Sequence, residues 1–163
     1  MDYVVRKIHR PRWDPISHID GIRADALKCL QTRQDQLSVW ECHNTHKDIE
    51  EAALAMAAAM DHLATFYLVL LKKKDLDKDS IKWVRTLGDT PIVDLQNRHI
   101  HLLELNIDHI NKLARHIAEQ TRDSNGLCYR FRQKEVKNLL IKAIQAGRLN
   151  IGKLKPDVRK KIP

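Results

Sequence analysis

The sequence predicts a fold of the α/β or α+β class, in which a small mixed sheet of three or four strands packs with four or five helices. Three observations support this. Residues 37–42 alternate apolar and polar side chains except at Trp40, as a half-buried strand does. Residues 49–63 repeat apolar side chains at helical spacing, and residues 66–71 are a continuous apolar run typical of a buried strand. Strand, helix and strand in this order predict a βαβ unit.

The elements before this unit are short. Residues 3–8 (YVVRKI) predict a strand, which Pro11 keeps from continuing. Residues 22–30 predict a short helix, and the polar residues 31–36 a loop. Thr45, followed three residues later by Asp48, has the spacing of a capping box and predicts where the long helix begins.

The second half of the chain predicts three further helices and one strand. Residues 77–85 are expected to form a short helix, and residues 98–105 a strand. Asn106 is a good N-cap for the amphipathic helix that follows it. After a break at residues 123–126, a basic helix covers residues 132–146 and ends at Gly147. Residues 148–163 form a basic, nearly aperiodic tail.

Length and composition indicate a single folded unit. The chain has 163 residues, 43% of them hydrophobic, and only five Gly and five Pro. The N-terminus lacks the apolar segment of a signal peptide, and the longest apolar stretch, residues 63–71, is shorter than the roughly 20 residues that a membrane span needs. Three cysteines fit no disulfide framework. We therefore expect a cytoplasmic protein without a membrane partner.

The net charge of +8 lies almost entirely at the C-terminal end. Residues 122–163 hold twelve Lys or Arg and three Asp or Glu, a balance of +9, whereas residues 1–121 hold seventeen and eighteen, a balance of −1. This asymmetry predicts a near-neutral body (1–121) and a basic helical C-terminal element (122–163) that is packed on the body or extends from it. Such an element favours a polyanion or an acidic protein surface.

The main functional hypothesis is an accessory protein that contacts nucleic acid or a nucleoprotein assembly through this element. Tyr129 and Phe131 could stack on bases beside it. The candidate nucleic-acid-binding residues are the lysines and arginines of the last helix and the tail: Arg130, Arg132, Lys134, Lys137, Lys142, Arg148, Lys153, Lys155, Arg159, Lys160 and Lys161.

Two alternatives remain open. In the first, the chain is a protein–protein interaction module, and its tail docks on an acidic partner in a stoichiometric complex. In the second, it is a small enzyme that uses the 88–101 segment with Asp89, His99 and His101; Asp94 could line the same cleft. The absence of a convincing catalytic motif makes a non-enzymatic role the preferred interpretation.

Other motifs give weaker signals. Residues 147–154 resemble a phosphate-binding loop, but Leu154 stands where a hydroxyl must hold Mg²⁺, and a helix precedes the loop instead of a strand. His99 and His101 share a strand face without the ligand number and spacing of a zinc site. We therefore expect neither a metal nor a cofactor. Among the cysteines, Cys128 has the most basic neighbourhood, which predicts a lowered pKa for its thiol.

Overall fold

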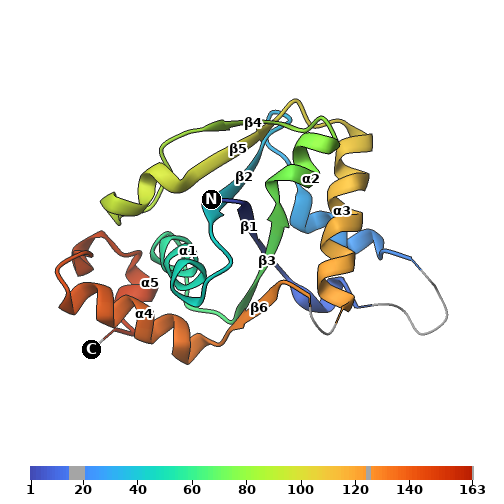
Figure 1. Ribbon diagram of the computed structural model, residues 1–163. Helices are drawn as coiled ribbons and strands as arrows, with labels where there is room; N and C mark the ends of the chain where they lie inside the picture. The colour runs from blue at the N-terminus through green and yellow to red at the C-terminus, as the bar shows by residue number, and fades with distance from the viewer. Residues whose placement is uncertain (15–20, 124–125, 163) are drawn as a thin grey trace.

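A six-stranded sheet forms the centre of the molecule (Figure 1). The computed structural model describes residues 1–14, 21–123 and 126–162. The strand order is β4-β5-β2-β1-β3-β6, and every neighbouring pair is antiparallel. The strands are β1 (Tyr3–Ile8), β2 (Leu37–Cys42), β3 (Phe66–Lys72), β4 (Lys82–Arg85), β5 (His99–Leu103) and β6 (Cys128–Phe131).

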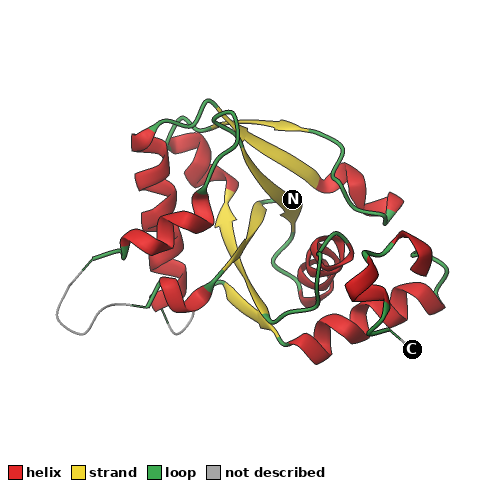
Figure 2. Cartoon of the chain, turned by 180° about the vertical axis from the view of Figure 1, so that it is seen from behind, coloured by secondary structure: helices red, strands yellow, loops and turns green. Residues whose placement is uncertain are grey.

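Helices cover both faces of this sheet (Figure 2). The α-helices are α1 (His46–Ala58), α2 (Lys73–Lys78), α3 (Ile107–Arg122), α4 (Gln133–Gln145) and α5 (Pro156–Arg159), and the 3₁₀ helices are η1 (Arg10–Arg12), η2 (Ala24–Leu30), η3 (Val93–Arg98) and η4 (Ile151–Lys153). No helix in the described ranges is long and apolar enough to cross a membrane.

The fold is of the α+β class, but its sheet is larger than the three or four strands predicted and is antiparallel throughout, not mixed. The predicted unit of strand, helix and strand is present as β2, α1 and β3, but the two strands are not neighbours. Both pair with β1, which lies between them and runs antiparallel to each. β2 and β3 are therefore parallel to one another across an inserted strand. Sequence spacing alone does not reveal such an insertion, because β1 comes from the chain's N-terminus.

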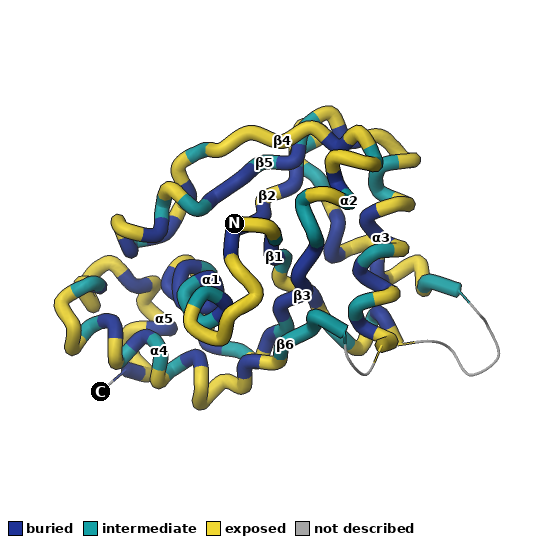
Figure 3. The backbone as a smooth tube through the Cα atoms, in the orientation of Figure 1, coloured by how far each residue is buried: buried dark blue, intermediate teal, exposed yellow. Residues whose placement is uncertain are grey.

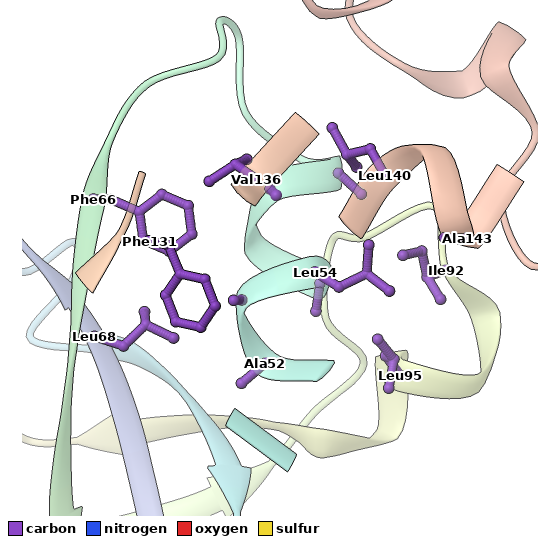
Figure 4. Close-up of a cluster of buried hydrophobic side chains, with 14 of the residues drawn as sticks. Ala52, Leu54, Phe66, Leu68, Ile92, Leu95, Phe131, Val136, Leu140 and Ala143 are labelled. Atoms are coloured by element: carbon purple, nitrogen blue, oxygen red, sulfur yellow. The ribbon is translucent and has the colours of Figure 1, made fainter. Parts of the chain in front are cut away.

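Two hydrophobic cores lie on opposite faces of the sheet, because successive strand residues point to opposite sides. Buried stretches follow β3 and β5 and recur on α1 (Figure 3). Val5 of β1 joins the core under α1 and α4, whereas Val4 joins the core under α3 and η2. In the first core the rings of Phe66 and Phe131 stack with centroids 5.7 Å apart, and Leu140 of α4 belongs to the same core as Leu54 of α1 (Figure 4). The alanine-rich face of α1 lets both α4 and the sheet approach closely.

Capping residues start α1 and α3 as predicted. The Thr45 side chain accepts a hydrogen bond from the Asp48 backbone N–H at 3.3 Å. Asp48 in turn accepts one from the His43 N–H at 2.9 Å. The Asn106 side chain accepts from the His109 N–H at 2.9 Å and caps α3. Gly147 follows α4 with φ of +70°, a conformation that suits glycine at a helix end.

Two predicted segments differ in the structure. Residues 77–85 form the end of α2 and then β4, not one helix. Residues 128–131, for which the sequence predicts no element, form β6, which pairs with β3 along the edge of the sheet. Both strands have four residues, too few for a periodic pattern to show. Part of the predicted break, Ser124 and Asn125, lies outside the described residues, as does Pro163.

Candidate nucleic-acid interface

Buried apolar side chains anchor the tail that follows α4. Leu149, Leu154, Val158 and Ile162 are at most 8% exposed, and all four belong to the core under α1 and α4. Their spacing of four or five residues keeps one side of the tail on the protein while the residues between them face outward. The tail that the sequence predicts as nearly aperiodic is therefore a folded part of the body, which fixes the positions of its lysines.

This anchoring brings three lysines around one open hollow, which we call the lysine hollow. It has a volume of about 440 Å³ and is lined by Leu63, Gln133, Lys134, Lys137 and Lys161. Lys134 and Lys137 lie three residues apart on α4, so they share one side of the helix. Lys161 is held there by the buried Ile162 next to it. The lining contains three positive charges and no carboxylate.

Most of the predicted basic residues keep their charge available to solvent. Within the ranges that the structure describes, nine of the eleven have no carboxylate within ion-pair distance. Lys160 forms a solvent-exposed pair with Asp157 at 3.5 Å, which contributes little. Arg130 lies 5.8 Å from the centre of the Tyr67 ring. The C-terminal charge is thus mostly uncompensated inside the molecule.

Arg148 is the exception. It donates hydrogen bonds to Glu51 of α1 at 2.9 and 2.5 Å and to Asp94 of η3 at 2.5 Å. The hydrogen bonds to Glu51 and Asp94 outweigh burial and raise the pKa of the guanidinium above its ordinary value. Two carboxylates neutralise this arginine, so we leave it out of the proposed interface. Its role is to join three elements.

A second hollow lies on the other side of α4, where positive and negative side chains alternate. It measures about 260 Å³, and its lining includes Arg130, Lys142, Glu50 and Glu135. The two aromatic residues predicted to stack on bases, Tyr129 and Phe131, line this second hollow and contact other side chains of the protein. Phe131 is 9% exposed and stacks on Phe66, whereas the Tyr129 hydroxyl donates to Asn44 at 2.9 Å. Mixed charge makes this hollow a weaker polyanion site than the lysine hollow.

The 88–101 segment brings only part of the alternative enzyme site together. Asp89 and His99 line one cleft, and the His101 ring packs edge-on against His99 with centroids 4.8 Å apart. Asp94 instead points to Arg148. The His99 Nδ1 lies 2.7 Å from the Thr86 hydroxyl, and burial, helped by His101, lowers the pKa of His99 to about 4. His99 is therefore neutral at pH 7.

The cysteines are free and largely shielded. Cys29 and Cys42 are buried and Cys128 is half-buried. Burial raises the pKa of Cys42 to about 12. Burial also raises the pKa of Cys128, although Arg10 opposes it. The expectation of a lowered pKa at Cys128 is therefore wrong, because its place in the sheet removes water from the thiol. Among the residues placed by the structure, no cluster of three or more His, Cys, Asp or Glu is arranged to hold a metal ion.

The fold and the lysine hollow define a small α+β protein whose basic C-terminal segment belongs to its core. Comparison of the chain with protein-family models, curated proteins and solved structures found no match in any of the three.

Proposed function

We propose that this protein binds nucleic acid, as an accessory protein, through the lysine hollow and the exposed basic residues around it. The observation that carries the proposal is the gathering of Lys134, Lys137 and Lys161 around one hollow without a carboxylate in its lining. Lysine ammonium groups at an open surface suit the phosphate backbone, which contributes most of the affinity in sequence-independent binding.

The hollow is shallow and has no array of aromatic side chains for stacking. Contacts to phosphates therefore fit it better than recognition of individual bases. The three free thiols agree with a reducing compartment, so we keep the cytoplasm as the expected location. An acidic protein surface remains the competing partner, since the same lysines would attract carboxylates.

Charge-neutralising substitutions test the proposal without removing any core residue. Deletion after Gly126 would not serve, because β6 and α4 help form the first core. The test variant is Lys134→Gln, Lys137→Gln and Lys161→Gln together. The matched control is Lys47→Gln, Lys74→Gln and Lys78→Gln, which removes the same three charges at exposed lysines of α1 and α2.

Fluorescence anisotropy with labelled single- and double-stranded oligonucleotides supplies the measurement. The proposal expects the test variant to bind at least about tenfold more weakly than the wild type, and the control to stay within about twofold. Equal weakening by both variants would show that net charge alone attracts the nucleic acid. If the wild type binds no oligonucleotide but captures an acidic protein through these lysines, the protein–protein alternative replaces the proposal.

A further inference from the structure

A second candidate site is a cleft that lies where two central strands separate. β1 pairs with β2 only from Tyr3 to Val5; beyond Val5 it stays paired with β3 alone, while β2 continues along β5. The cleft at this separation measures about 660 Å³. That volume falls within the roughly 300–1,000 Å³ of small-molecule sites.

Arg6 holds a fixed positive charge in the cleft wall. Its Nε and Nη2 donate to the Cys29 carbonyl at 3.2 and 2.9 Å, and its Nη1 donates to the Ser38 carbonyl at 2.7 Å. These carbonyls hold the guanidinium across the gap between the strands. No carboxylate of the residues described here lies within ion-pair distance of it. A guanidinium has five N–H donors, so donors remain for a ligand.

Lys7, the next residue of β1, adds a second positive charge to the cleft from the opposite face of the sheet. Its side chain is exposed to the cleft, and it forms no ion pair with any residue that the structure places. The protein around it removes water from the ammonium group, which, together with Arg6, lowers the pKa of Lys7 despite the opposing charge of Asp61. The cleft at the gap between the strands is therefore lined by one cation from each face of the sheet.

The rest of the cleft has a different chemistry. Met56 and Met60 from the end of α1, with Trp40 and Phe66 from the sheet, supply apolar lining. Two exposed carboxylates, Asp61 and Asp89, also line it. The cleft thus combines cations, an apolar surface and hydrogen-bond acceptors.

We infer that this cleft binds a nucleotide, with the phosphate between Arg6 and Lys7, where the two strands separate, and the base against Met56 and Met60. A nucleoside phosphate carries the three complementary features: an anionic group, a flat apolar ring, and ring or amino N–H donors for the aspartates. An inorganic anion would leave the apolar lining unused, and an apolar ligand would leave Arg6 without a counter-charge. The inference goes beyond the proposed function and does not depend on it.

The nucleotide has two possible sources, a free mononucleotide or one unit of a bound strand. The segment after α1 connects the two sites, because Asp61 and Thr65 line the cleft whereas Leu63 lines the lysine hollow. Thr65 also accepts a hydrogen bond from the Gln133 N–H at 3.2 Å, and Gln133 lines the lysine hollow. A nucleic-acid strand bound at the lysine hollow would therefore have only the 61–65 loop between it and the cleft.

The methionine methyl groups report on the cleft directly. The chain has only three methionines, and Met56 and Met60 line the cleft whereas Met1 does not. The full-length protein is labelled with ¹³C-methyl methionine, and its signals are assigned with Met56→Leu and Met60→Leu. It is then titrated separately with each of the four ribonucleoside 5′-monophosphates, with inorganic phosphate, and with a single-stranded oligonucleotide.

The inference expects saturable shifts of Met56 and Met60, with Met1 unchanged, for at least one mononucleotide or for the oligonucleotide. Shifts with a mononucleotide identify a free ligand, and shifts with the oligonucleotide alone identify a strand unit. Lys7→Gln should weaken the binding roughly tenfold, whereas Lys74→Gln should leave it within about twofold.

Three results would overturn the inference: no methionine shift with any nucleotide probe, equal shifts with inorganic phosphate, or unchanged affinity in Lys7→Gln. The variant of the three hollow lysines separates this inference from the proposed function. If the nucleic-acid proposal fails, that variant binds oligonucleotides like the wild type, while any mononucleotide shifts at Met56 and Met60 persist.

Discussion

Arg148 donates to both carboxylate oxygens of Glu51, from Nη1 at 2.9 Å and from Nη2 at 2.5 Å. The pair joins the segment after α4 to α1, 97 residues earlier. The two side chains are 32% and 18% exposed, so solvent screens the pair only in part. We predict that Arg148→Gln lowers the free energy of unfolding by about 1–3 kcal/mol, measured by chemical denaturation.

A lysine at this position should recover only part of that loss, because it cannot bind the carboxylate with two parallel hydrogen bonds. The same Arg148→Gln protein, assayed where it is folded, should bind oligonucleotides like the wild type. A loss of affinity as large as that of the three hollow lysines would mean that Arg148 leaves Glu51 to bind the ligand.

The lack of a side chain at Gly88 leaves room for Trp40 and His99, which both line the cleft. A Cβ atom there would lie 2.5 Å from Trp40 Cη2 and 2.9 Å from His99 Cβ. Both neighbours are buried, so they have little room to move. Gly88→Ala should therefore cost about 1–3 kcal/mol of stability in thermal or chemical denaturation.

Gly152→Ala is the matched control, since its Cβ would approach only the exposed Asn150 side chain, at 3.1 Å. That change should stay within about 0.5 kcal/mol of the wild type. If Gly88→Ala loses as little stability as the control, then Trp40 does not pack tightly against this turn.

His99 should make stability depend on pH. The folded protein lowers the pKa of His99 to about 4, mainly through burial, from an ordinary value of 6.5. Between these two values the unfolded chain binds a proton at this position and the folded protein does not. Stability should therefore fall as the pH is lowered from about 6.5 to about 4, by up to about 1.4 kcal/mol per pH unit.

The comparison is between the wild type and His99→Gln in urea denaturation at several pH values. The variant starts less stable because it loses packing on Trp40, but its stability should decline less over this interval. His62→Gln, which alters an exposed histidine, should keep the wild-type slope. Parallel slopes for the wild type and His99→Gln would contradict the assignment.

The long elements of this fold are predictable because their signals are local. Thr45 and Asn106 cap α1 and α3, and the apolar run from Phe66 forms β3. The position of β1 between β2 and β3 is a long-range property that no window of sequence carries. β4 and β6 are edge strands of four residues, paired on one side only, so they need less apolar character than a central strand.

The candidate interface was predictable in composition but not in arrangement. The charge count identifies Lys134, Lys137 and Lys161 along with eight other residues. Which of them share a surface depends on the buried anchors of the tail, Leu149 through Ile162. The four- and five-residue spacing of these apolar residues is visible in the sequence and could have predicted that the tail packs on the body. The ion pairs of Arg148 with Glu51 and Asp94 could not be predicted, because both partners lie far away in the chain.

The salt dependence of nucleic-acid binding shows whether the lysines of the hollow contact phosphates. Each phosphate contact to a single strand contributes about 0.7 to the slope of log affinity against log salt concentration. Replacing Lys134, Lys137 and Lys161 with glutamine should therefore reduce the magnitude of the wild-type slope by about 2, whereas the variant at Lys47, Lys74 and Lys78 should retain it. A wild type that binds with no salt dependence, or a variant of the three hollow lysines with an unchanged slope, would mean that these lysines do not bind phosphates.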